Sequence, residues 1–440
     1  MAWGLLLVAT AAFSGVSWMA WQGRLGFAAI GLLAVATVLF GLGRRSLSKD
    51  TRKRIDLLAK IAFTVVGIMA LLRHPIEAND GAQLPLYEAI GAYIGQVDAN
   101  TFIFWAFVAM GVKFVGVITS AWAWSLLLQG QGIRFPFWQK IMTSFLIGRF
   151  IGTFLPSTIG LDGYTLYEAG RYSNAWPRVV TAKALEKFIG VTGLFLGMVL
   201  TMPFGYSVIT NVAADLERPD AAPLLAGAIL AVAGGVSAVV VVGLVWPIVP
   251  VTIMKLITSI TAKFEGRVPL AGAIVRQLER FTGAVGAYEG KVGLLMLALA
   301  AKFVTHFTTA AVYFFTALAI GVVGAEFWPI TFGSTIQILA TLLSPTIAGE
   351  GAREAFQALL LKEQLGGVEQ AVLSGALGFI AAEAATMWGG IFLWVRTPEW
   401  RPTFAEVDGQ QVDYAWLVGD EGGFDAERIA KVMREGANKS

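Results

Sequence analysis

The chain has no cysteine, which excludes disulfide bonds, thiolate nucleophiles and cysteine-ligated metal sites together. Its histidines are His74 and His306, too few for a histidine-rich metal site, and no cofactor is expected. Charge is scarce as well. Asp, Glu, Lys and Arg make up 14% of the 440 residues, whereas soluble domains average about 25%. Because hydrophobic residues reach 56%, the composition predicts an integral membrane protein.

Basic residues gather in one short loop. The formal net charge is +3, and the loop 44–54 alone carries six Lys and Arg residues against Asp50. Basic loops stay on the cytoplasmic side of a membrane, which explains the positive charge better than a nucleic-acid partner does. With this loop in the cytoplasm, the predicted spans place both termini there as well. The N-terminal apolar run lacks a basic region before it and is followed at once by another run, which favours a first span over a cleaved signal.

Apolar runs of about 20 residues, long enough to cross a bilayer as a helix, recur along the chain and predict an all-α polytopic membrane protein. The acidic stretches 73–100 and 203–222 are expected outside. The segment 250–290 has the amphipathic spacing of interfacial helices on the cytoplasmic surface. Residues 396–440 are expected to form a cytoplasmic tail, partly ordered near 412–418, with a short terminal helix. The eight predicted full spans are 3–21, 25–43, 55–72, 101–128, 178–202, 223–248, 291–323 and 368–395.

Two further apolar pieces are too short and too interrupted to be ordinary spans. The segment 140–172 breaks at Pro156 and the segment 329–364 breaks at Pro345, and each continues through a glycine-containing turn into a shorter helix. Such a pair predicts two re-entrant helical hairpins related as an inverted repeat, one entering from each side, with a binding site at the midplane. An ordinary kinked span at each position is the alternative.

The predicted transmembrane domain covers residues 1–395. Its parts are two N-terminal helices with the basic loop (1–54), a first half that contains the first hairpin (55–222) and a second half that contains the second hairpin (223–395).

Arg149 is the sharpest candidate in the first hairpin. A guanidinium keeps its charge and can bind phosphate through two parallel hydrogen bonds, so a phospholipid head group is the expected partner. The alternative is an ion pair with Asp162 or Glu186 that only holds the hairpin together. Gly160 turns the chain before Asp162, which could cap the following helix while the helix N-terminus receives an anion.

The span after this hairpin carries Lys183, Glu186 and Lys187 on one helix face, because they are spaced i, i+3 and i+4. Glu186 needs a cationic partner, for which Arg149, Lys183 and Lys113 are candidates. Lys187 could bind the substrate or simply extend to the membrane interface. Lys113 stands in the middle of an apolar span with no acid beside it in sequence, which favours an inward-facing, substrate-binding role.

The second half offers candidates for a proton or charge relay. Lys302 and His306 share one face of an apolar span, although a lone histidine is more often a hydrogen-bonded core residue. Glu383 stands mid-span and must be paired or protonated. The candidates beyond the second break are Glu350 and Arg353 as substrate ligands and Glu354 as a further relay.

Signatures of soluble enzymes are weak. The Ser and Thr residues beside Pro156 and Pro345 have no histidine near them in sequence, so no nucleophile with an adjacent base can be assembled. The run 419–423, GDEGG, lacks the lysine and the strand-to-helix frame of a phosphate loop. Catalytic activity is therefore not expected.

The residues that carry a family resemblance are Arg149, Pro156, Gly160, Asp162, the pair Glu186–Lys187 and the run 345–351. Together they resemble the lysylphosphatidylglycerol synthase transmembrane family, the flippase-like integral membrane proteins, over about residues 55–395. The resemblance implies a multi-span protein of a prokaryotic cytoplasmic membrane with paired re-entrant hairpins. In the multiple peptide resistance factor proteins this domain translocates aminoacylated phosphatidylglycerol.

Departures from the family pattern concern the head group more than the fold. Glu186 is followed by Lys187 where the pattern has Glu-Arg, Asp162 is followed by Gly163 and Tyr164 without a nearby Arg, and the second turn has fewer glycines. A cytoplasmic acyltransferase domain, which makes the aminoacyl lipid, is not expected in this sequence, so the resemblance does not imply synthase activity.

The sequence thus predicts a lipid flippase-like transporter for a phosphate-bearing, and by resemblance aminoacylated, membrane lipid. Lys113, Arg149 and Lys183 would receive the head group, and acids such as Glu186 would balance charge. One alternative is an intramembrane transferase that acts on a lipid-linked substrate with Asp162 or Glu186 as base. The other is a non-transporting assembly partner that acts through its basic amphipathic segment and acidic tail. Homo-oligomerisation is left open.

Overall fold

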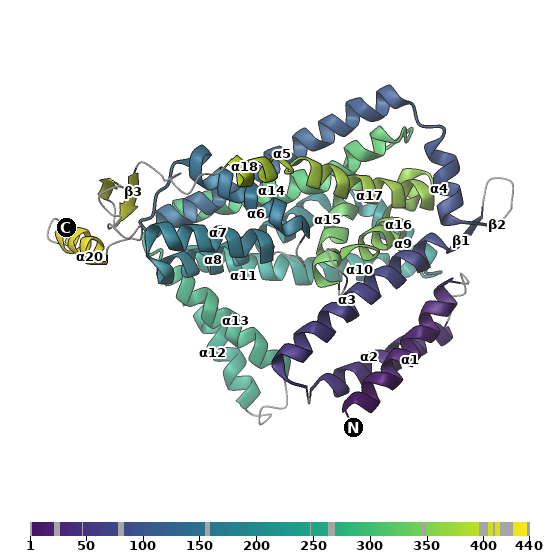
Figure 1. Ribbon diagram of the computed structural model, residues 1–440, viewed down its shortest axis with the longest axis horizontal. Helices are drawn as coiled ribbons and strands as arrows, with labels where there is room; N and C mark the ends of the chain where they lie inside the picture. Colours follow the sequence, from purple (N-terminus) through teal and green to yellow (C-terminus); the bar gives the residue numbers. More distant parts are fainter. Residues whose placement is uncertain are drawn as a thin grey trace. The chain divides into compact units, whose positions relative to one another are not determined.

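The computed structural model describes residues 2–21, 27–45, 47–77, 83–154, 159–246, 248–262, 269–344, 346, 349–395, 404–407, 410–413 and 426–437. These residues are mostly helical, with two short antiparallel β-hairpins, and form an all-α multi-pass membrane protein (Figure 1). The chain makes two compact units that are divided within α5 (Ala99–Gly130), α14 (Val292–Ala319) and α17 (Val368–Ala384). The first unit comprises Met1–Phe107 and Tyr313–Phe379, and the second comprises Val108–Val312 and Ile380–Ser440.

Within the described part of the chain, six helices are long and apolar enough to cross a membrane. They coincide with six of the eight predicted runs. The first two runs form α1 (Ala2–Trp21) and α2 (Phe27–Arg44), which pack against each other and whose described apolar parts are shorter. The six long segments are Arg54–Leu72, Ala99–Gly130, Trp176–Thr201, Pro219–Val245, Val292–Ala319 and Val368–Val395.

In the first unit, α3 (Lys49–Leu72) begins where the Ser48 hydroxyl accepts a hydrogen bond from the Thr51 backbone N–H, a normal N-cap. The helix carries the basic loop into its first turns, and after Lys60 its residues are apolar except for Thr64. It is followed by the antiparallel pair β1 (Pro75–Glu77) and β2 (Gln83–Pro85), and by α4 (Leu86–Ile94). The acidic stretch 73–100 therefore contains regular structure.

The second predicted hairpin forms in this unit from α15 (Phe327–Leu343) and α16 (Ala352–Leu365), which pack against each other. The turn needs glycine, because Gly349 and Gly351 have φ angles of 73° and 77°. Pro345, the predicted break, lies outside the described residues. Whether this helical hairpin re-enters the membrane stays a prediction.

The first predicted hairpin forms in the second unit. A π-helical turn at Phe137–Met142 leads into α6 (Thr143–Phe154), and α7 (Ile159–Ser173) returns alongside it. The two helices approach closely at Gly160, where a Cβ atom would overlap the backbone of Gly152. The predicted break at Pro156 lies outside the described residues, and re-entry into the membrane again stays a prediction.

The core of the second unit lies among α5, α8 (Trp176–Thr201), α13 (Pro269–Gly286) and α14, where large side chains such as Trp124, Leu185 and Phe281 are buried. These helices have little one-sided amphipathicity apart from α13, as expected where helices meet lipid and other helices. The remaining elements here are α9 (Tyr206–Asp215), a 3-10 turn (Pro219–Ala221), α10 (Ala222–Ile229), a π-helical turn (Leu230–Gly234) and α11 (Gly235–Val245).

The segment 250–290 forms two helices, α12 (Ile248–Ala262) and α13, which pack against each other. In α13, Phe281 and Val285 are buried while Glu279 and Arg280 are exposed, which confirms the amphipathic pattern. After α17, α18 (Trp388–Val395) is followed by the tail elements β3 (Phe404–Val407), β4 (Gln410–Asp413) and α20 (Ala426–Ala437). The terminal helix is thus confirmed, and most of 412–418 lies outside the described residues.

Candidate functional site

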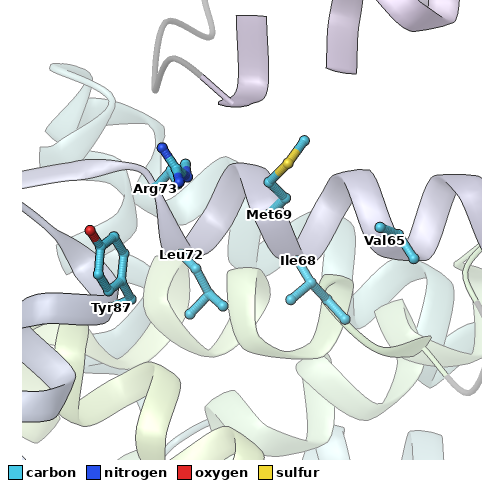
Figure 2. A pocket seen from close by; sticks show the side chains of 6 residues that line it. All are labelled: Val65, Ile68, Met69, Leu72, Arg73 and Tyr87. Atoms are coloured by element: carbon cyan, nitrogen blue, oxygen red, sulfur yellow. The ribbon is translucent and has the colours of Figure 1, made fainter. Parts of the chain in front are cut away.

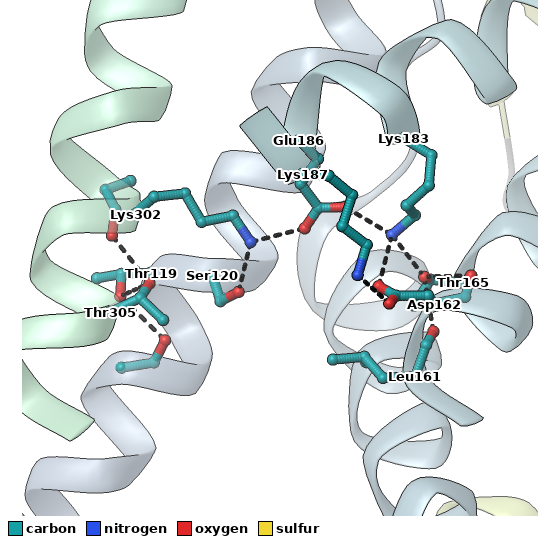
Figure 3. A network of polar contacts seen from close by, with 12 residues as sticks. Thr119, Ser120, Leu161, Asp162, Thr165, Lys183, Glu186, Lys187, Lys302 and Thr305 are labelled. Atoms are coloured by element: carbon teal, nitrogen blue, oxygen red, sulfur yellow. Dashed lines mark hydrogen bonds and ion pairs between the residues drawn. The ribbon is translucent and has the colours of Figure 1, made fainter. Parts of the chain in front are cut away.

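Glu186 on α8 is the centre of a buried polar network in the second unit (Figure 3). Its Oε1 lies 2.6 Å from Nζ of Lys302 on α14, and its Oε2 lies 2.6 Å from Nζ of Lys183, one turn away on α8. Lys302 also donates to the Ser120 hydroxyl at 2.8 Å, and Lys183 donates to the Thr165 hydroxyl at 3.0 Å. Three helices and the returning arm of the first hairpin therefore converge on one carboxylate.

Close helix packing makes these contacts possible. A Cβ atom at Gly193 would lie 2.8 Å from the backbone carbonyl carbon of Lys302, so only glycine allows α8 and α14 to come this near. Between α5 and α14, the hydroxyls of Thr119 and Thr305 are 2.9 Å apart and share a hydrogen bond. Lys183 also lies 4.0 Å from the centre of the Trp124 ring on α5, a favourable cation–π distance.

Asp162 lies at the edge of this network and is paired with Lys187; its other oxygen lies 3.7 Å from Lys183 (Figure 3). Because α7 begins at Ile159, Asp162 belongs to the first turn of the helix and does not occupy the N-cap position. A carboxylate there still favours the helix dipole. The Lys187 side chain is about half exposed, at 52%, and so forms the outer end of the network.

Arg149 on α6 pairs with Glu383 on α17, with 3.5 Å between Nη2 and Oε1. It does not pair with Asp162 or Glu186, the two carboxylates that the sequence suggested as partners for an ion pair holding the hairpin together. Its Nε also donates to the Thr386 hydroxyl at 3.4 Å, and the Thr153 hydroxyl donates to the second Glu383 oxygen at 2.5 Å.

Lys113 on α5 is buried, and its Nζ donates to the Thr309 hydroxyl on α14 at 3.0 Å. Among the described residues, no carboxylate is close enough to form an ion pair with it. The charges of Arg149 and Glu383 nevertheless act on it electrostatically. His306, on the same face of α14, feels the charges of Lys302 and Lys113 and interacts with the Gly190 backbone. The histidine thus lies within the same electrostatic environment.

We call these ionisable side chains the charged cluster. Five cationic groups face three carboxylates, which leaves two formal positive charges in a largely buried region. A net charge in such surroundings is costly unless a counterion joins it, so the charged cluster is suited to receive an anion. Its members are Lys113, Arg149, Lys183, Lys187 and Lys302 with Asp162, Glu186 and Glu383.

Glu350, Arg353 and Glu354 belong to the first unit and have a different environment. Arg353 pairs with Glu354, with Nη2 2.5 Å from Oε1, and lies over the Phe379 ring at 4.2 Å. Glu354 also accepts the Gly351 backbone N–H at 2.8 Å, which caps α16. These contacts hold the second turn together. The predicted roles of the three residues in substrate binding or relay stay predictions.

Sequence reasoning missed a buried ion pair in the first hairpin. Lys140 lies 2.8 Å from Glu168, with both side chains at most 5% exposed, and 2.9 Å above the Tyr172 ring. A signal was present: an antiparallel hairpin that brings Gly152 against Gly160 also places residue 140 opposite residue 172. The hydroxyl partners in the charged cluster carried no comparable signal, because Ser and Thr are common in apolar helices.

Within the described ranges, no three His, Asp or Glu side chains lie close enough together to hold a metal ion. The residues brought together are instead cations, carboxylates and hydroxyls. This set can bind an anionic group through charge-assisted hydrogen bonds.

Comparison with known proteins gives one match. Residues 88–391 match the model of the lysylphosphatidylglycerol synthase TM region, and the matched range includes every member of the charged cluster. Searches of curated proteins and of solved structures found no match. Because the matched range covers more than half of the chain, the protein belongs to the family of the lysylphosphatidylglycerol synthase transmembrane region.

Proposed function

We propose that the protein is a flippase-like transporter that moves a phosphate-bearing lipid across the cytoplasmic membrane, with the charged cluster as its head-group site. The main observation behind this proposal is the excess of cations over carboxylates in a largely buried region of membrane-spanning helices. A phosphate would supply the missing negative charge. The lipid tails would remain in the bilayer while the head group occupies the charged cluster.

Lys113 is the cation best suited to contact the phosphate, because its hydrogen-bond partner among the described residues is a neutral hydroxyl. Arg149 is held by a long ion pair of 3.5 Å and can offer further N–H groups to the same phosphate. Lys183 and Lys302 are each 2.6 Å from Glu186, so their contribution is to the local potential. The two hairpins would then act as the moving or gating parts.

The family supports a lipid substrate. Its name refers to the membrane region of proteins that make lysylphosphatidylglycerol, an aminoacylated lipid that carries both a phosphate and amino groups. In this chain the phosphate would bind Lys113 and Arg149, and an amino group would find carboxylates at Asp162 and Glu383.

The test is transport in reconstituted vesicles that contain fluorescent phosphatidylglycerol, with a membrane-impermeant quencher to follow the lipid in the outer leaflet. We expect Lys113→Met to slow lipid movement about tenfold or more, because a charge-assisted hydrogen bond to the phosphate is lost. The matched control is Lys255→Met, since Lys255 is exposed on α12. Unchanged transport of every anionic lipid in the Lys113 variant would overturn the site assignment.

An intramembrane transferase is the second candidate, and one observation favours it: the Thr153 hydroxyl donates to Glu383, as a hydroxyl does before a general base activates it. The carboxylate of Glu186, which the sequence offered as a base, is held by two lysines instead. A transferase changes lipid composition, whereas a flippase changes only sidedness. Mass spectrometry of lipid extracts from membranes with and without the protein distinguishes the two.

The assembly-partner alternative depends on the tail. It expects loss of function on deletion of 396–440 while charged-cluster variants such as Lys113→Met remain active. Transport measured for both variants in the same vesicles separates this alternative from the flippase.

A further inference from the structure

The outer end of α3 carries an open apolar groove in the first unit (Figure 2). Val65, Ile68, Met69 and Leu72 line it, at the i, i+3, i+4 and i+7 spacing that forms one helical stripe. Arg73 lies at the end of the stripe. With Tyr87 from α4 the open groove has a volume of about 570 Å³, within the usual size of a small-molecule site.

The stripe belongs to a helix that is long and apolar enough to cross a membrane, so lipid tails are its natural surroundings. Val65 is 58% exposed, so the groove is open at the end away from Arg73. From Val65 to Arg73 the helix rises about 12 Å, close to the roughly 15 Å thickness of one hydrocarbon leaflet. The groove therefore has the length of the upper part of an acyl chain.

Arg73 gives the groove a polar end at the depth of a phosphate. It follows directly after the apolar segment Arg54–Leu72, at the opposite end from the basic loop 44–54. In a spanning helix this position lies at the membrane interface, where a guanidinium can form paired hydrogen bonds with lipid phosphate.

The local backbone fixes the groove in shape. The Leu86 backbone N–H donates to the His74 carbonyl at 3.0 Å, so Arg73 and Tyr87 are each next to one member of this hydrogen-bonded pair. Leu86 itself is fully buried and anchors the start of α4. The Tyr87 hydroxyl donates to Glu88 at 2.8 Å, and the Tyr87 side chain lines the groove together with Leu72 and Arg73 (Figure 2).

We propose that this groove binds one glycerophospholipid, with its phosphate on Arg73 and one acyl chain along the stripe from Val65 to Leu72. The complementarity of charge at one end and of apolar surface along the rest selects this occupant over a soluble anion or a neutral lipid. The groove belongs to the first unit and shares no residue with the charged cluster, so it is a second lipid site that does not depend on the proposed function.

Native mass spectrometry of the purified chain in detergent tests the proposal. The protein is titrated with phosphatidylglycerol or with diacylglycerol of the same chains. We expect one phosphatidylglycerol to bind at least tenfold more tightly than diacylglycerol, because only the former has the phosphate. Arg73→Ala should remove this preference and Arg73→Lys should keep part of it. Arg218→Ala, in an exposed loop where Arg218 pairs with Asp220, should leave it unchanged.

A second variant tests the apolar part without changing the charge. Val65→Trp fills the open end of the groove and should weaken both lipids by a similar factor, while Lys255→Met, at an exposed position on α12, should leave both affinities unchanged. The proposal is overturned if Arg73→Ala binds as the unaltered protein does, if Val65→Trp has no effect, or if inorganic phosphate alone displaces the lipid.

Discussion

Arg149 and Glu383 lie 234 residues apart in the chain yet form an ion pair between α6 and α17, with Nη2 and Oε1 separated by 3.5 Å. The pair connects the first arm of a helical hairpin to the part of α17 that belongs to the second unit. Both side chains are about one-fifth exposed, so the pair is neither a surface contact nor a fully desolvated one. Its strength should therefore be intermediate.

Glu383→Gln should lower the free energy of unfolding by about 2 kcal/mol, because Arg149 would lose its anionic partner in a region that is mostly buried. The midpoint of thermal unfolding in detergent measures the change. Glu363→Gln is the control, since Glu363 is exposed on α16. Equal midpoints for the two variants would show that the pair contributes nothing.

Glu186→Gln should be more severe, with a loss of about 3 kcal/mol or more, because two buried lysines would face each other without their shared carboxylate. Adding Lys302→Met should recover part of this loss by removing one of the unbalanced charges. Thermal unfolding of the single and double variants checks the prediction. A double variant no more stable than Glu186→Gln would contradict it.

Two glycines of α7 offer a matched pair. Gly160→Ala should destabilise the protein, because the added Cβ would overlap the Gly152 backbone and push the hairpin arms apart. Gly163→Ala meets open space and should be neutral or stabilising by up to about 1 kcal/mol through helix propensity. Limited proteolysis and thermal unfolding compare the two. Similar behaviour of both variants would mean that the arms do not need this close approach.

Asp98 should make stability depend on pH. The Thr101 backbone N–H donates to its carboxylate at 2.7 Å and lowers the pKa of Asp98 below its usual value of 3.8. A lowered folded-state pKa stabilises the folded protein above the unfolded-state pKa. This contribution is lost as the pH falls through the folded value. Asp98→Asn should therefore flatten the fall in unfolding temperature below about pH 4. An unchanged acid profile would show that this cap does not contribute.

Much of the fold could be predicted because hydrophobic runs and helix breakers are local signals. Six long apolar helices and both helical hairpins lie where the sequence placed them. Spacing along one helix was enough to predict the contact between Lys183 and Glu186. An unbalanced charge within an apolar span was enough to predict that Lys113 is buried.

Partners from distant helices were not predictable. Nothing in the sequence near Arg149 indicates Glu383, and nothing near Glu186 singles out Lys302, because both pairings arise only when the helices pack. Glu354 shows a second limit of sequence reasoning: a carboxylate beside a helix break can also cap the next helix, as its hydrogen bond from the Gly351 backbone N–H shows. Sequence reasoning has no means of separating these two uses of a carboxylate.

The polar face of α14 has a further consequence for the path of a head group. Lys302, Thr305 and Thr309 follow one another along this helix and are linked to α5 or α8. From Lys302 to Thr309 the helix rises about 10 Å, roughly one-third of the hydrocarbon thickness of a bilayer. In the proposed transport, a phosphate that passes from the neighbourhood of Lys302 to that of Lys113 would cover this third of the hydrocarbon thickness in one step, transferred from one ammonium group to the next. The remaining two-thirds of the proposed path would lie along other surfaces.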